Sequence, residues 1–146
     1  MKRDHDKSEG EIHWIIPGVL ATSERPGYPG ITVKPTAVDR WLEEVRRQRI
    51  RSVINLLSDD EMTVYYRQLG QPLAHYYTDA GLAVRQVAQE DLGVAVPSHV
   101  LLDRVKTAFA SLPKPVLIHC SAGTERSKIA VAAICRVWKR QARQRF

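Results

Sequence analysis

A cysteine and an arginine six positions apart are the residues of this chain best suited to chemistry. Cys120 follows an apolar run of strand type at residues 115–118, and Arg126 comes after five intervening residues. We expect a helix at residues 128–140. A strand that ends in a compact loop and restarts as a helix directs backbone N–H groups and the positive helix end toward one point. Such a loop binds an oxyanion such as phosphate, and it favours the thiolate form of a cysteine at its centre.

The composition fits one small domain. The chain has 146 residues, 44% of them hydrophobic, which is enough for a real core. We expect residues 1–11, which are polar and charged, to be a disordered leader, and residues 12–146 to form a single domain that is short at its C-terminus. The N-terminus does not resemble a signal peptide, and no apolar run approaches the roughly 18 residues that cross a bilayer.

The two cysteines, Cys120 and Cys135, form no disulfide framework and have no metal-ligand spacing. We therefore expect no metal, no cofactor and a reducing, cytoplasmic location. The formal net charge of +6 comes largely from arginines near residues 46–51 and 136–145. Aromatic residues are not interleaved with these charges, so we expect solvated helix faces rather than nucleic-acid or membrane binding. A positive surface would also attract phosphorylated substrates, and oligomeric state is not indicated.

The remaining elements alternate between strand and helix patterns. Strands are predicted at residues 12–16, 19–21, 53–57, 82–87 and 115–118. Helices are predicted after Thr36 as N-cap, in two short pieces between Asp59 and Gly81, and from Pro97–Ser98 onward. Ser58, with Glu61 three residues later, matches a capping box. Residues 23–35 and 89–96 are expected to be loops. This order predicts an α/β fold with a small, largely parallel sheet of four to five strands and helices on both faces.

Residues 119–127 resemble the signature loop of the cysteine-dependent protein phosphatases, which has His-Cys, five residues, then Arg followed by Ser or Thr. Residues 81–98 are similar to the general-acid loop of the compact dual-specificity phosphatases, in which a strand leads to an Asp and a Pro-Ser pair opens the next helix. The resemblance runs from about residue 14 to the end of the chain. It implies a phosphatase-like fold and a phosphorylated protein or small phosphomonoester as substrate.

The resemblance gives each loop residue a role in phosphomonoester hydrolysis. Cys120 would attack phosphorus as a thiolate, and Arg126 would hold two phosphate oxygens with its planar fork. Ser127 could donate its hydroxyl to the departing thiolate, and His119 would orient the loop from behind. Phosphate-binding N–H groups are expected from the loop backbone, at Ser121, Ala122, Gly123, Thr124, Glu125 and Arg126.

The leaving oxygen must be protonated, and two aspartates compete for that role. Asp91 follows the predicted strand and matches the family acid in its distance from Gly81. Asp79 sits at the end of a predicted helix, where an aspartate is usually solvated. We therefore assign the general acid to Asp91 and keep Asp79 as the alternative.

Other functions stay open. Glu125 and Lys128 stand where relatives commonly have glycine, so a phosphate-binding module that has lost efficient turnover is one alternative. A rhodanese-like sulfurtransferase, which also places a cysteine in an anion-binding loop, is another, although the acid-loop match disfavours it. Residues 121–125 contain no Lys or Arg, which disfavours highly charged inositol phosphate or phosphoinositide substrates.

Overall fold

A five-stranded sheet forms the centre of the computed structural model, which describes residues 11–91, 94–121 and 125–144. Its strands, in the spatial order β1-β2-β7-β3-β4, are β1 (His13–Ile16), β2 (Leu20–Ser23), β7 (Val116–His119), β3 (Ser52–Asn55) and β4 (Ala83–Gln86). β1 pairs with β2 antiparallel, and the other pairs are parallel. The largely parallel sheet predicted from the sequence is confirmed.

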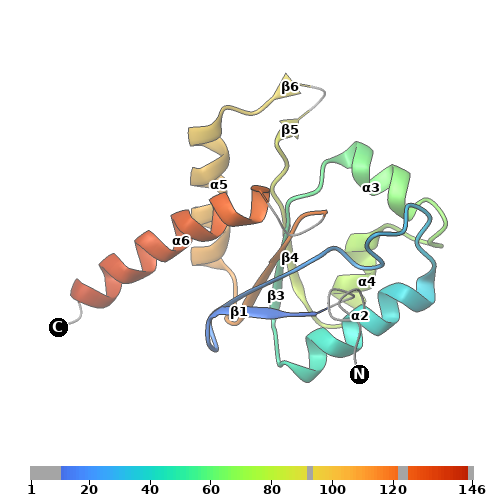
Figure 1. Ribbon diagram of the computed structural model, residues 1–146, viewed down its shortest axis with the longest axis horizontal. Coiled ribbons are helices and arrows are strands. Elements are labelled where there is room, and N and C mark those ends of the chain that lie inside the picture. Colours follow the sequence, from blue (N-terminus) through green and yellow to red (C-terminus); the bar gives the residue numbers. More distant parts are fainter. Residues whose placement is uncertain (1–10, 92–93, 122–124, 145–146) are drawn as a thin grey trace.

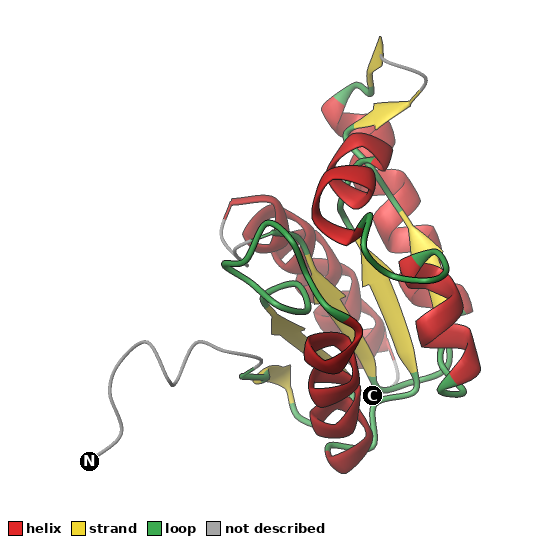
Figure 2. Cartoon of the chain, turned by 90° about the vertical axis from the view of Figure 1, so that its right-hand side faces the viewer, coloured by secondary structure: helices red, strands yellow, loops and turns green. Residues whose placement is uncertain are grey.

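Helices cover both faces of the sheet, as predicted (Figure 1, Figure 2). They are α2 (Pro35–Arg47), α3 (Asp59–Tyr66), α4 (Leu73–Asp79), α5 (Ser98–Ser111) and α6 (Glu125–Gln144). In Figure 1, α5 and α6 lie on one side of the sheet and α2, α3 and α4 on the other. In the described part of the chain, no helix is long and apolar enough to cross a membrane.

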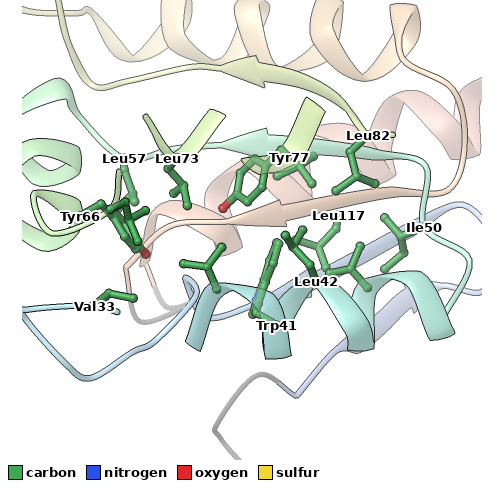
Figure 3. Close-up of a cluster of buried hydrophobic side chains, with 14 of the residues drawn as sticks. Val33, Trp41, Leu42, Ile50, Leu57, Tyr66, Leu73, Tyr77, Leu82 and Leu117 are labelled. Atoms are coloured by element: carbon green, nitrogen blue, oxygen red, sulfur yellow. The ribbon is translucent and has the colours of Figure 1, made fainter. Parts of the chain in front are cut away.

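Alternate residues of the strands feed two separate hydrophobic clusters. Leu117 of β7 faces the cluster under α2, α3 and α4, whereas Ile118 faces the cluster under α5 and α6. Figure 3 shows the first cluster, where Trp41 of α2 stacks on Tyr77 of α4 with ring centroids 5.4 Å apart. Strands buried on both faces are typical of parallel sheets between two helix layers.

Three details differ from the sequence predictions. Thr36 is not the N-cap of α2, because Lys34 occupies that position and Pro35 opens the helix. Pro is favoured there since its fixed φ suits the first turn and its missing N–H is not needed. Residues 89–96, predicted as a loop, contain the two-stranded hairpin of β5 (Glu90–Asp91) and β6 (Val94–Ala95), which lies outside the main sheet. Helix α6 begins at Glu125, three residues earlier than predicted.

The carboxyl ends of three parallel strands meet beside Cys120. His119 at the end of β7 is in register with Ser23 of β2 on one side and Asn55 of β3 on the other. The chain leaves all three strands at this edge, so the segments that follow β2 and β3 flank the loop that follows β7. Ligand sites of open α/β sheets lie at this edge.

Candidate active site

Cys120 and Ser127 are in direct contact at the carboxyl end of β7. The Ser127 hydroxyl donates a hydrogen bond to the Cys120 sulfur over 3.1 Å, and both residues are buried. Cys120 directly follows β7 and Ser127 lies in the first turn of α6, so the strand-loop-helix connection itself creates the pair. A hydroxyl donor at this distance stabilises a thiolate more than a neutral thiol.

Arg126 is held by a carboxylate from a different part of the chain. Its Nη1 donates to Glu61 Oε1 over 2.6 Å and its Nη2 to Glu61 Oε2 over 2.9 Å. Both side chains are about three-quarters buried. The hydrogen bond to Arg126 lowers the pKa of Glu61, and the same bond raises the pKa of Arg126. Such a two-bonded pair fixes the plane of the guanidinium as well as its position.

Glu61 combines this contact with the helix cap predicted from the sequence. The Ser58 hydroxyl accepts the Glu61 N–H, and the Ser58 N–H donates to Glu61 Oε1, which completes the capping box of α3. The cap therefore orients the carboxylate that receives Arg126. Sequence reasoning identified the cap and missed its second role, because the partner lies 65 residues away.

The pairing with Glu61 leaves one edge of Arg126 available. A guanidinium has five N–H donors. Glu61 accepts one from each Nη atom, and the Leu56 carbonyl accepts another from Nη1 over 3.3 Å. Nε and the second Nη2 hydrogen have no acceptor among the residues that the structure describes. They share one edge of the planar group, and such an edge can bind two oxygens of a phosphate.

His119 is a buried, neutral support behind Cys120. Its Nδ1 lies 3.2 Å from the Cys120 carbonyl, which can only accept, so we assign the ring proton to Nδ1. Nε2 then accepts from the Tyr77 hydroxyl at 2.9 Å. Burial lowers the pKa of His119 to about 4. These contacts fit the orienting role predicted for His119 rather than proton transfer.

Arg25 was missed by sequence reasoning and lies against the loop. It follows β2, and its main-chain N–H donates to the Ser121 carbonyl over 3.0 Å. Its Nε donates to the Ser121 hydroxyl over 3.2 Å, and its Nη2 donates to the Gly30 carbonyl over 2.7 Å. The guanidinium also lies over the Tyr65 ring, 3.8 Å from its centroid. Knowledge that β2 is the parallel neighbour of β7 would have pointed to it.

Helix α3 therefore serves both arginines. Glu61 and Tyr65 are four residues apart, which places them on one face of the helix. Glu61 holds Arg126, and Tyr65 packs against Arg25.

The two candidate acids lie in different places. Asp91 is the last residue of β5, and its side chain lies outside the described part of the structure. Asp79 ends α4 and accepts a hydrogen bond from Gln71 at an exposed position. Because α4 leads into the start of β4, Asp79 lies at the end of the sheet opposite Cys120.

The centre of the loop is outside the described residues. Ala122, Gly123 and Thr124 belong to this part, as does the Glu125 side chain. The phosphate-binding role predicted for their N–H groups stays a prediction. No group of side chains in the described part of the chain could hold a metal ion.

Comparison with known proteins gives structural matches without sequence matches. No protein-family model matches the chain, and no curated protein does. The kinase associated phosphatase, solved with its catalytic-site cysteine replaced by serine, superposes with a TM-score of 0.61 at 20% identity, over 79% of this chain. The chain spans 63% of that protein's length.

Two other solved structures are similar. Tk-PTP in its active form has a TM-score of 0.54 and 23% identity, covering 86% of this chain and 73% of its own. PTPMT1 in complex with PI(5)P has a TM-score of 0.54 and 17% identity. The match covers 84% of this chain and 70% of PTPMT1. The arrangement of strands and helices around Cys120 is thus the fold of the cysteine-dependent protein phosphatases.

Proposed function

We propose that the protein hydrolyses phosphomonoesters through a phosphocysteine intermediate on Cys120. The contact between the Ser127 hydroxyl and the Cys120 sulfur, at the carboxyl edge of the parallel sheet, carries the proposal. The free edge of Arg126 supports it, since the geometry suits a tetrahedral oxyanion.

In the first step the Cys120 thiolate attacks phosphorus. A sulfur–phosphorus bond forms, the ester phosphorus–oxygen bond breaks, and Asp91 gives its proton to the departing oxygen. Arg126 and the loop N–H groups stabilise the charge on the three phosphoryl oxygens during transfer.

In the second step water attacks the phosphocysteine and passes a proton to the Asp91 carboxylate. The phosphorus–sulfur bond breaks, and inorganic phosphate and the Cys120 thiolate are released. Ser127 favours this step because its hydroxyl stabilises the thiolate that leaves.

We infer a phosphorylated protein, of the tyrosine or dual-specificity type, or a small phosphomonoester as substrate. Residues 121–125 carry no Lys or Arg, unlike a loop suited to several phosphate groups. The structural neighbours do not narrow the substrate further, since one is named a kinase associated phosphatase and another was solved with the phosphoinositide PI(5)P. A reducing, cytoplasmic setting would suit a thiolate nucleophile.

Hydrolysis of an aryl phosphate, with vanadate as inhibitor, tests the proposal. We expect turnover by the wild type and none by Cys120→Ser, which should still bind vanadate or phosphate. A wild type that binds phosphopeptides without hydrolysing any aryl phosphate would make the chain a binding module instead.

The acid assignment needs a matched pair. We expect Asp91→Ala to slow substrates with poor leaving groups much more than those with good ones, because the latter need no proton. Asp79→Ala should behave as the wild type. The opposite result would show that Asp91 is not the general acid.

A further inference from the structure

Arg25 is a buried cation beside the proposed nucleophile. Its exposed fraction is 2%, although arginine is among the residues least often buried. Backbone and side chain both bind Ser121, the residue after Cys120, so Arg25 grips the first turn of the loop by two bonds.

In the described part of the chain, the Arg25 guanidinium contacts neutral groups: the Ser121 hydroxyl, the Gly30 carbonyl and aromatic rings. The guanidinium lies 3.8 Å from the ring centroid of Tyr65, and 5.5 and 5.9 Å from those of Tyr28 and Tyr66. Its Nη1 is buried without a hydrogen-bond acceptor among the described residues. Burying a charge with an unfilled donor is unfavourable, so a role for the charge itself is worth testing.

The two arginines beside the loop differ in the groups that face their charge. The charge of Arg126 is offset by the Glu61 carboxylate at 2.6 Å. Arg25 has ring faces around it, which attract a cation without cancelling its charge. Its field reaches the end of β7, because Arg25 and Arg126 each contribute, after burial, to the lowered pKa of His119.

We propose that Arg25 is a positioning residue whose positive charge stabilises the anion held by the Cys120 loop. That anion is the Cys120 thiolate in the free protein and the phosphoryl group after transfer. Because the Ser121 hydroxyl accepts from Arg25, its own hydrogen points away from Arg25. The assignment rests on the proposed function for the phosphoryl stage and is independent of it for the thiolate.

The test is the pH profile of Cys120 alkylation by iodoacetamide, followed by mass spectrometry so that Cys135 is counted separately. Arg25→Met places an apolar chain among the tyrosine rings, and Arg25→Gln keeps hydrogen-bonding ability without charge. We expect the midpoint of the Cys120 profile to rise by about half a pH unit or more in both, since a lost nearby cation disfavours the thiolate. Ser121→Ala keeps the charge and should shift the midpoint less.

Thermal unfolding separates this role from a merely structural one. Arg25→Met removes the charge together with the hydrogen bonds to Ser121 and Gly30, so Arg25→Gln is compared with it, and a raised alkylation midpoint in a variant that stays folded at the assay temperature reports the charge. Ser52→Ala is the matched control. It removes a buried hydroxyl that donates to the Pro113 carbonyl at the start of β3, the end of the sheet opposite Cys120, and leaves Arg25 in place. It should lower the Tm and leave the alkylation midpoint unchanged.

Arg51→Met controls for the loss of one positive charge. Arg51 is exposed, and its N–H donates to the Pro115 carbonyl at the opposite end of β7 from Cys120. Arg51→Met should not move the alkylation midpoint of Cys120.

Alkylation profiles like that of the wild type in both Arg25→Met and Arg25→Gln would overturn the proposal, even if aryl phosphate hydrolysis is found. A shifted midpoint in a protein without hydrolysis would overturn the proposed function and leave the role of Arg25 standing.

Discussion

Arg126 and Glu61 form a two-bonded ion pair between the first turn of α6 and the first turn of α3. The pair fixes the guanidinium of Arg126, so that the edge formed by Nε and Nη2 is held in one position for a phosphate. Rigid placement matters because a displacement of about 1 Å can cost a hundredfold in rate.

Glu61→Gln should therefore reduce kcat/KM for an aryl phosphate by about 10- to 100-fold. The amide can still accept the Ser58 N–H and complete the capping box, but Arg126 loses its counter-charge, so we also expect a loss of about 1–3 kcal/mol of stability. Steady-state kinetics and thermal unfolding measure the two effects. An unchanged kcat/KM would show that Arg126 needs no carboxylate to hold it.

Ser58→Ala is the complementary variant. It removes the hydroxyl that accepts the Glu61 N–H and keeps the carboxylate. We expect a loss of about 1 kcal/mol of stability, typical of an N-cap deletion, with a smaller effect on kcat/KM than that of Glu61→Gln. Urea unfolding gives the free energy. A larger kinetic defect than in Glu61→Gln would mean that the cap, and not the ion pair, controls the loop.

Ser127→Ala should slow the second chemical step more than the first. The variant loses the donor 3.1 Å from the Cys120 sulfur, so the thiolate becomes a poorer leaving group. A lost bond to a charged group of about 1.5–3 kcal/mol corresponds to roughly 10- to 100-fold in rate. Stopped-flow hydrolysis should show a burst of aryl product followed by a slow steady state. Equal slowing of burst and steady state would argue against this role.

Tyr77→Phe should destabilise the fold by about 1–3 kcal/mol, because the buried His119 Nε2 loses its donor. Tyr76→Phe, on the same helix, is the control and should change stability by less than about 0.5 kcal/mol. Denaturant unfolding compares the two. Equal losses would show that the bond to His119 contributes nothing specific.

Acid should weaken the fold through His119. Its pKa is about 4 in the folded chain against an ordinary 6.5, so the unfolded chain binds more protons between these values. The contribution of neutral His119 to the free energy of unfolding is therefore fully present above about pH 6.5. It is lost as the pH falls toward 4, by about 3 kcal/mol at most.

Unfolding free energies across that pH range measure the effect. His119→Asn should flatten the pH dependence, whereas replacement of the exposed His75 by Gln should leave it unchanged. A dependence that persists in His119→Asn would place its origin elsewhere.

Local patterns predicted most of the elements. The capping box of Ser58 and Glu61 is confirmed. It could be predicted because all its atoms lie within one turn of the chain. The strand at residues 53–57 is confirmed in kind, although β3 is shorter and begins at Ser52. The predicted N-cap at Thr36 is wrong because Pro35 occupies the first helical position. The preference of proline for that position is also visible in the local sequence.

The contacts around the loop were harder to predict, since they depend on the order of strands in space. Arg25 reaches Ser121 across 96 residues because β2 lies beside β7. Glu61 reaches Arg126 because β3 lies on the other side of β7. A single sequence shows which segments are strands, but the parallel neighbours of each strand follow from packing of the whole chain.

The eight residues of α3 have a consequence for ligand affinity. Isolated helices of this length are marginal, so α3 depends on its cap and its packing. Any opening of α3 releases the supports of Arg25 and Arg126 together, and the apparent affinity for phosphate then scales with the fraction of molecules in which the helix is formed. Conversely, saturating phosphate or vanadate should slow amide hydrogen exchange in α3, a segment that the ligand need not touch.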